Sequence, residues 1–132
     1  MPDWIIIEES DYDNSAAPHG DKWKIKLSKE DGFYKSTVFH ELGHVFMFEH
    51  TFGKRLKKPN WRPSLDEAGK YAVTTYRSSQ PDPAEGWAES FTDYYERREY
   101  LKKESPELYR FWHSMEKQNV VIEKTAKNIK NL

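Results

Sequence analysis

The chain contains no cysteine, which excludes a disulfide framework and a thiolate metal site. Any metal ion must therefore be held by histidine and carboxylate side chains. An excess of either charge is also absent, because the chain has 21 Lys and Arg and 22 Asp and Glu. This near balance argues against a general nucleic-acid or anionic-membrane binder. The basic cluster at residues 54–62 is better explained as a solvated loop after a helix than as a nucleic-acid contact.

Long apolar runs are absent as well. No segment approaches the ~18 apolar residues of a membrane span. The first ten residues, MPDWIIIEES, lack the basic region and the long apolar stretch of a signal peptide. We therefore expect a cytoplasmic protein without membrane contact. A length of 132 residues predicts one domain, residues 1–132, and the sequence does not indicate an oligomeric state.

The arrangement of apolar residues predicts an α+β domain with a small N-terminal sheet. Residues 4–8 and 23–27 are expected to form strands, with a loop over residues 10–21. Apolar residues and lysines alternate in Trp23-Lys-Ile25-Lys-Leu27, which is typical of an exposed edge strand with one covered face. Backbone groups on such an edge can pair with an extended peptide. Trp23, Ile25 and Leu27 are therefore candidate substrate-binding residues, and a simple solvated edge is the alternative.

Helices are expected to make up the rest of the chain. Residues 33–52 are apolar nearly all round, as in a buried central helix, with Asp31 or Ser28 as the N-cap and Gly53 at the C-terminus. Further helices are predicted over residues 64–72, 83–103 and 106–118, and residues 73–77 are predicted to be extended. The polar residues 119–132 are expected to be helical or frayed, and they are a candidate flexible or latency tail.

The central helix carries the motif HELGH, from His40 to His44. Positions four apart on a helix lie one above the other, about 6 Å apart along the axis. Both imidazoles can therefore reach one Zn²⁺ from consecutive turns. Glu41 borders the ligand face without being a ligand, which is the place of the general base in zinc peptidases. Gly43 costs about 1 kcal/mol relative to Ala inside a helix, so we expect another element to approach closely there.

A catalytic zinc site needs a third protein ligand. Glu85 and Glu89 lie four apart on the helix predicted from residue 83, so their side chains point the same way. One can bind the metal while the other hydrogen-bonds a ligand histidine. Trp87 and Phe91 make this helix amphipathic, and two glutamates beside a buried face would be costly without a cation.

These two segments, His40–His44 and Glu85-Gly-Trp-Ala-Glu89-Ser-Phe91, together resemble the gluzincin zinc metallopeptidases. They are most similar to the catalytic domain of anthrax lethal factor and to minimal single-domain gluzincins, over roughly residues 36–95. The resemblance implies a zincin-like fold.

It also implies roles for individual residues. His40, His44 and Glu85 would be the zinc ligands, Glu41 the base, and Glu89 the hydrogen-bond partner of a ligand. Tyr76 would stabilise the oxyanion, with Tyr71 as the alternative. The family has an aromatic residue where this chain has Gly86, and we expect Gly86 to face Gly43 between the two helices.

His50 is the other candidate for the third ligand, because the spacing from His40 to His50 matches the metzincin motif HExxHxxGxxH. That motif needs a glycine where the helix breaks, and Met47 occupies this position. On a continuous helix His50 points away from the metal. His19 and His113 are isolated and are expected to be surface or core residues.

The predicted function is a zinc-dependent endopeptidase that hydrolyses peptide bonds of a peptide or protein substrate with zinc-activated water and Glu41 as the general base. Action on a regulatory partner inside the cell, as in phages or mobile elements, is one compatible setting. The alternative is a non-catalytic or latent zinc-binding module that acts through protein interaction. Complete coordination by protein side chains, for example with Glu123 as the fourth ligand, would favour that alternative.

Overall fold

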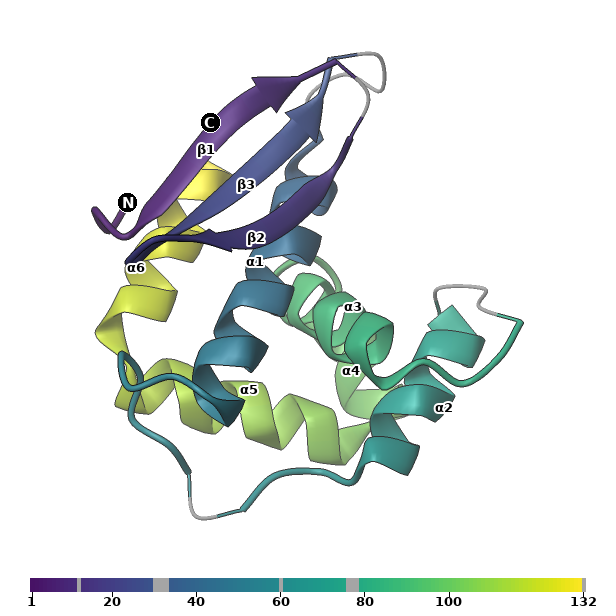
Figure 1. Cartoon of the computed structure of the whole chain (residues 1–132). Coiled ribbons are helices and arrows are strands. Elements are labelled where there is room, and N and C mark those ends of the chain that lie inside the picture. The colour runs from purple at the N-terminus through teal and green to yellow at the C-terminus, as the bar shows by residue number, and fades with distance from the viewer. Residues whose placement is uncertain (12, 30–33, 60, 76–78, 132) are drawn as a thin grey trace.

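The computed structural model describes residues 1–11, 13–29, 34–59, 61–75 and 79–131. It confirms the predicted α+β architecture: an N-terminal sheet packs on a central helix, α1 (Lys35–Thr51), and a helical part follows (Figure 1). The remaining helices are α2 (Leu65–Thr75), α3 (Pro83–Glu96), α4 (Arg98–Glu104), α5 (Pro106–Gln118) and α6 (Val120–Lys130). Among the described residues, no helix has both the length and the apolar character of a membrane span.

The sheet has three strands in the order β1-β3-β2, namely β1 (Ile5–Ser10), β3 (Lys22–Ser28) and β2 (Ser15–His19). β1 runs parallel to β3, and β2 runs antiparallel to it. The predicted edge strand is therefore the central one, and the edge-strand prediction is wrong. The predicted loop over residues 10–21 also contains β2. Gly20, with φ of 65°, makes the tight turn that joins β2 to β3.

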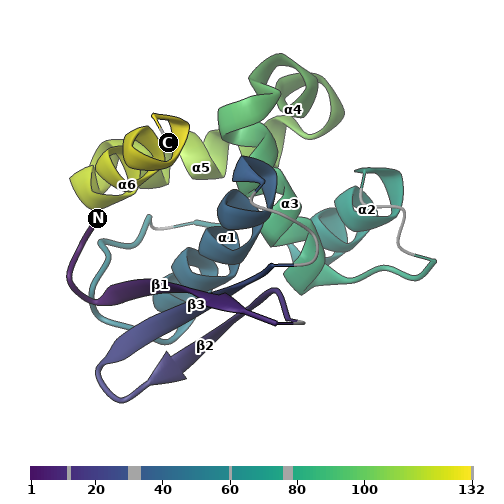
Figure 2. The same ribbon diagram turned by 90° about the horizontal axis from the view of Figure 1, so that it is seen from above.

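The inner face of β3 belongs to the core. Ile25 is fully buried and Leu27 is 7% exposed, so neither side chain is accessible to a substrate. Figure 2 shows α1 lying along one face of the sheet. The alternation of apolar residues and lysines thus correctly predicts that one face of the strand is covered. The lysines do not mark an open edge, however, because β3 has a neighbouring strand on each side.

Helix α1 confirms the predicted central helix, but its ends differ from the prediction. Its N-cap is Tyr34, without a side-chain hydrogen bond; Ser28 ends β3, and Asp31 lies outside the described residues. Phe52 is the C-cap, and the backbone N–H of Gly53 donates to the carbonyl of Glu49. A side chain at Gly53 would overlap the buried Glu49 carboxylate, so that carboxylate would have to shift.

Helix α3 crosses α1 at Gly43, where a Cβ would lie 2.8 Å from the Cα of Ala88. This confirms the predicted close approach, but the partner is Ala88 and not Gly86. Gly86 instead packs against α2, where a Cβ would overlap the carbonyl of Ala68. The expected contact between Gly43 and Gly86 is therefore wrong, because the two glycines serve contacts with two different helices.

The boundaries of the other helices agree in part with those predicted from the sequence. Asp82 caps α3 by accepting from the N–H of Glu85, and Ser105 caps α5 by accepting from the N–H of Leu108. The helix predicted over residues 83–103 is interrupted at Arg97, which separates α3 from α4. Residues 73–75 continue α2, so the prediction of an extended segment is wrong there, and residues 76–77 of that segment lie outside the described residues.

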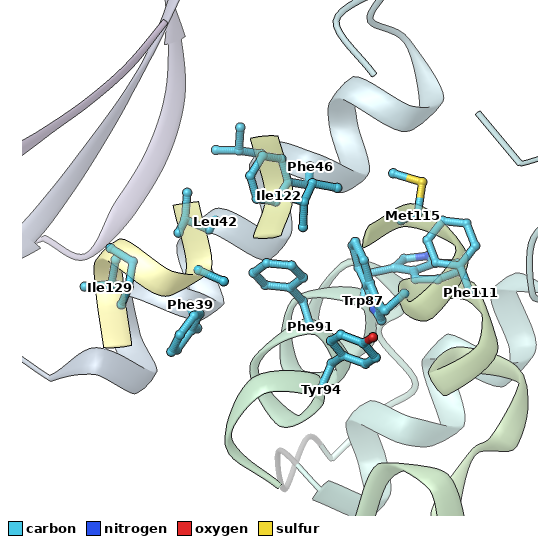
Figure 3. Close-up of a cluster of buried hydrophobic side chains, with 14 of the residues drawn as sticks. Phe39, Leu42, Phe46, Trp87, Phe91, Tyr94, Phe111, Met115, Ile122 and Ile129 are labelled. Atoms are coloured by element: carbon cyan, nitrogen blue, oxygen red, sulfur yellow. The ribbon is translucent and has the colours of Figure 1, made fainter. Parts of the chain in front are cut away.

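An aromatic core joins these helices (Figure 3). Phe91 of α3 packs edge-on against Phe46 of α1, with ring centroids 5.4 Å apart, and against Trp112 of α5, at 4.8 Å. Helices α6 and α3 flank α1 on opposite sides (Figures 1 and 2). Ile122 and Ile129 of α6 are buried in this core, so the predicted helical character of the C-terminal segment is confirmed for Val120–Lys130.

His50 lies in the same core and gives a prediction about stability. Its ring packs edge-on against Phe111 at 5.0 Å, and within the described structure neither ring nitrogen has a hydrogen-bond partner. Burial, with smaller contributions from the charges of Arg62 and Lys58, lowers the pKa of His50 from 6.5 to about 4. At pH values between about 4 and 6.5, the His50 side chain binds more protons in the unfolded chain than in the folded one. The free energy of unfolding should therefore fall by up to about 3 kcal/mol as the pH drops through this window.

Urea unfolding of the metal-free protein at pH 7 and pH 4.5 measures this loss. The variant His50→Leu, which keeps the core filled, provides the control. We expect wild type to lose more stability than His50→Leu over this interval. Equal losses in the two proteins would contradict the assignment of the effect to His50.

Candidate metal centre

Three side chains from α1 and α3 converge on one point. The Nε2 atoms of His40 and His44 lie 3.2 Å apart. The Glu85 carboxylate spans both, with Oε2 3.0 Å from Nε2 of His40 and Oε1 3.2 Å from Nε2 of His44. The two histidines are neighbours because of helical periodicity, and Glu85 reaches them because α3 crosses α1 so closely at Gly43. Two helices thus present three ligand-type atoms to a common centre.

These separations fit a zinc site. With ligand bonds of 2.0–2.1 Å, tetrahedral coordination places neighbouring ligand atoms about 3.3 Å apart. The two imidazole nitrogens are 3.2 Å apart, close to that value, and each has a different oxygen of the Glu85 carboxylate at 3.0 or 3.2 Å. One ligand atom from each of the three residues lies within 4.8 Å of the others. Two imidazoles and one carboxylate are also a donor set that Zn²⁺ accepts. His40, His44 and Glu85 can therefore hold a metal ion.

Glu89 lies on the far side of the His40 ring. Its Oε2 atom is 3.5 Å from Nδ1 of His40, whereas Nε2 of the same ring faces Glu85. The two ring nitrogens thus face two different carboxylates one helical turn apart. A carboxylate beside the nitrogen that does not bind metal fixes the tautomer and the orientation of the ring.

The electrostatics of the two histidines differ. Burial alone would lower the pKa of His40, but the hydrogen bond that Glu89 accepts from it and the charges of Glu85 and Glu41 outweigh burial and leave the pKa raised. Burial and the neighbouring charge of His40 lower the pKa of His44. Without metal the pair therefore holds a proton preferentially on His40. A bound metal would replace that proton, because histidine binds metal in its neutral form.

Glu41 is buried to 7% exposure and lines the cleft above the three ligand-type side chains. Burial raises the pKa of Glu41, and the charge of His40 opposes this rise. Among the described residues, no side chain forms a hydrogen bond with its carboxylate. The charges of Glu41 and His40 affect each other's pKa, so this carboxylate lies near the ligand-type side chains.

The centre opens into a cleft of about 1070 Å³ between β2 on one side and α1 and α3 on the other. Ser36, Thr37, Met47, Phe48 and Phe52 line its floor along α1, together with the histidines and Glu41. From β2 come Ala16 and Pro18, with Trp23 beside them. The site is therefore accessible to a ligand much larger than water.

Strand β2 is the feature that sequence reasoning missed. The N–H of Trp23 donates to the carbonyl of Trp4 at 2.7 Å, so the backbone groups of Trp23 face β1. The backbone groups of the alternate residues Lys24 and Lys26 face β2, where these residues pair with Ala17 and Ser15.

Backbone groups therefore point outward at the intervening β2 positions. Ala16 presents both an N–H and a C=O on this outer edge, and Pro18 presents only a C=O. The proline made the segment resemble a loop, although prolines are tolerated on edge strands.

Trp23 is the one predicted substrate-binding residue of β3 that lines the cleft. The residue is 5% exposed, and its indole N–H donates to Oε1 of Glu49 at 2.9 Å. Arg55 also donates to that oxygen, at 2.7 Å. The buried Glu49 carboxylate thus ties β3 to the end of α1 and fixes the indole that forms part of the cleft wall.

Of the two candidate tyrosines, the structure describes only Tyr71. Tyr76 lies outside the described residues. The hydroxyl of Tyr71, the alternative, donates to Oδ2 of Asp93 at 2.5 Å, and Arg97 holds the same carboxylate at 2.9 and 3.1 Å. Tyr71 is 3% exposed and does not line the cleft. It therefore connects α2 to α3 and is not positioned to contact a substrate.

The remaining metal-ligand candidates also lie elsewhere. His50 is buried against Phe111, and the only described group of metal-ligating side chains that includes a histidine of α1 is His40, His44 and Glu85. Glu123 pairs with Lys127 on α6, and no described residue of α6 lines the cleft. His19 is exposed on β2, and His113 lies 3.1 Å from the hydroxyl of Tyr94. The described residues therefore supply three ligands and no fourth.

Comparison with known proteins gives no family for this chain: no family model matches it, and no curated protein and no solved structure matches it.

Proposed function

We propose that the protein is a zinc-dependent endopeptidase of the gluzincin type. The observation that carries this proposal is the convergence of His40, His44 and Glu85, with ligand-type atoms 3.0–3.2 Å apart, in an open cleft that a buried glutamate also lines. Three protein ligands leave the fourth coordination position for water or substrate, as catalytic zinc sites require. A purely structural zinc site would use four protein ligands.

A zinc ion in this centre would lower the pKa of a coordinated water towards ~7 and polarise the carbonyl of a bound peptide. Glu41 accepts the proton of the attacking water. It then delivers that proton to the amide nitrogen as the C–N bond breaks, so the products are one carboxylic acid and one amine. Glu89 keeps the His40 ring oriented throughout.

Strand β2, and not β3, aligns the substrate backbone in this proposal. The N–H and C=O of Ala16 are adjacent on the outer edge, so one residue of an antiparallel peptide can pair with both. Pro18 adds an acceptor but no donor. Trp23 contributes its ring to the cleft wall. A substrate held in this way lies between β2 and the HELGH face of α1.

The resemblance to gluzincins implies that Tyr76 stabilises the oxyanion, and this role stays a proposal. Tyr71 is a poor substitute because its hydroxyl is engaged by Asp93. Hydrolysis by Tyr76→Phe, compared with Tyr71→Phe, distinguishes the two tyrosines. We expect the first substitution to lower kcat and the second to affect mainly stability.

Zinc removal tests the proposed function. Protein purified without chelators should contain about one zinc ion per chain, and it should cut a proteome-derived peptide library. Treatment with 1,10-phenanthroline should abolish cleavage, and an equimolar addition of zinc should restore it. Cleavage that persists in the metal-free protein would refute the proposal. One bound zinc without any cleavage would instead favour the non-catalytic or latent module.

A further inference from the structure

The end of the cleft towards the C-terminus of α1 exposes large apolar side chains. Phe48 is 42% exposed, Phe52 is 73% exposed, and Leu65 at the start of α2 is 59% exposed. All three line the same cleft as the metal centre. Exposed apolar groups gathered in a cleft mark a binding surface, because water contact at each of them is unfavourable.

The aromatic rings at this end form a continuous row. The ring of Trp23 lies 5.1 Å from that of Phe48, and Phe48 lies 5.1 Å from Phe52. Trp23 is anchored by Glu49, so the row extends from a fixed wall out to the rim of the cleft. The opposite end of the floor is polar, with Ser36 and Thr37. The cleft thus has an apolar end and a polar end, with the metal centre between them.

The spacing of this row matches an extended peptide. His44 and Phe48 on α1 and Phe52 at its C-cap follow one another at intervals of four residues, about 6 Å of helix axis each. Alternate side chains of a strand, which point to the same side, are about 6.8 Å apart. A strand laid along α1 can therefore place one side chain on Phe48 and, two residues further, another on Phe52.

The direction of β2 determines which part of the substrate reaches this end. Pro18 pairs with Trp23, whose ring contacts Phe48, so β2 ends at the apolar end of the cleft. Strand β2 therefore runs in the same direction as α1 along the cleft. A peptide antiparallel to β2 has its N-terminal part over Phe48 and Phe52.

We propose that the cleft selects peptide segments with two large apolar side chains, separated by one residue, within about five residues before the scissile bond. Phe48, Phe52 and Leu65 are the specificity-determining residues. This inference rests on the proposed peptidase function only for the location of the scissile bond. The binding preference itself does not require catalysis.

Binding to the variant Glu41→Gln tests the preference independently of cleavage. The probes are fluorescein-labelled decapeptides that carry either two Phe or Leu residues at alternate positions or Ser at the same positions. Fluorescence anisotropy of the zinc-loaded variant should give a Kd about tenfold lower for the apolar peptide, which corresponds to about 1.4 kcal/mol. Phe52→Ser should remove most of this difference. Val120→Ser should leave it unchanged, because Val120 is 59% exposed on α6 and does not line the cleft.

Cleavage profiling with wild type then separates the two proposals. Enrichment of an alternating apolar pair before the cut sites supports both. Efficient cleavage without that enrichment would overturn the specificity inference and leave the peptidase proposal intact. Preferential binding of the apolar peptide without cleavage would support the inference and refute the peptidase. Equal Kd values for the two probes would overturn the inference whatever the outcome of profiling.

Discussion

Glu41→Gln is expected to retain about one zinc ion per chain and to lose peptide hydrolysis by at least about a hundredfold, the usual contribution of general acid–base catalysis. Glutamine has nearly the same shape as glutamate, so the buried position beside the ligands stays filled. The amide cannot accept the proton of the attacking water, however, and cannot return one to the leaving amine. Zinc content by atomic emission and initial rates on a fluorogenic peptide measure the two effects separately.

Glu99→Gln is the matched control, because the Glu99 side chain is 86% exposed on α4 and pairs with Lys102 outside the cleft. Its rate should equal that of wild type. A Glu41→Gln protein that cleaves at the wild-type rate would eliminate Glu41 as the base. A variant that has lost its zinc as well would instead indicate that Glu41 contributes to metal binding.

Glu85→Ala is expected to weaken zinc binding by more than the 10–100-fold that removal of a ligand's hydrogen-bond partner costs. It removes the carboxylate that bridges His40 and His44. Glu89→Gln removes only the partner of Nδ1 and should fall within that 10–100-fold range. Competition for zinc against a chromophoric chelator measures both affinities on one scale. Equal affinities of Glu85→Ala and wild type would disprove the assignment of Glu85 as a ligand.

Thermal unfolding gives a second measurement of the same site. Zinc at 100 times its Kd should stabilise wild type by about 2.7 kcal/mol, because it binds the folded chain at a site that joins α1 to α3. The stabilisation should disappear in Glu85→Ala at the same zinc concentration. Glu99→Gln should again behave as wild type. A zinc-induced rise in Tm that survives in Glu85→Ala would place the metal elsewhere.

The part of the centre that could be predicted is the part that depends on local geometry. His40 and His44 lie together because a helix brings positions four apart into register, and the sequence alone predicts that helix. Gly43 correctly indicated a close helix crossing. Its partner depends on how α3 is rotated about its own axis, and the spacing of residues along the chain does not determine that rotation.

The central position of β3 in the sheet could not be predicted from the pattern of its side chains. An alternation of apolar and charged residues shows which face of a strand is covered. Whether a strand has one neighbour or two is decided by backbone hydrogen bonds, in which side chains take no part. Ala16 and Pro18 therefore form the outer edge even though Trp23, Ile25 and Leu27 carry the clearer strand pattern. A short strand of small residues with a proline gives little signal of its own.

The proline in β2 has a consequence for the behaviour of the protein at high concentration. An uncovered strand can recruit the same strand from another molecule, and such pairing grows into aggregates when it continues along the whole edge. Pro18 withholds the donor that a second copy would need to extend the ladder. If β2 pairs with a peptide substrate as proposed, the same edge would accept a short peptide and still resist polymerisation of the protein with itself.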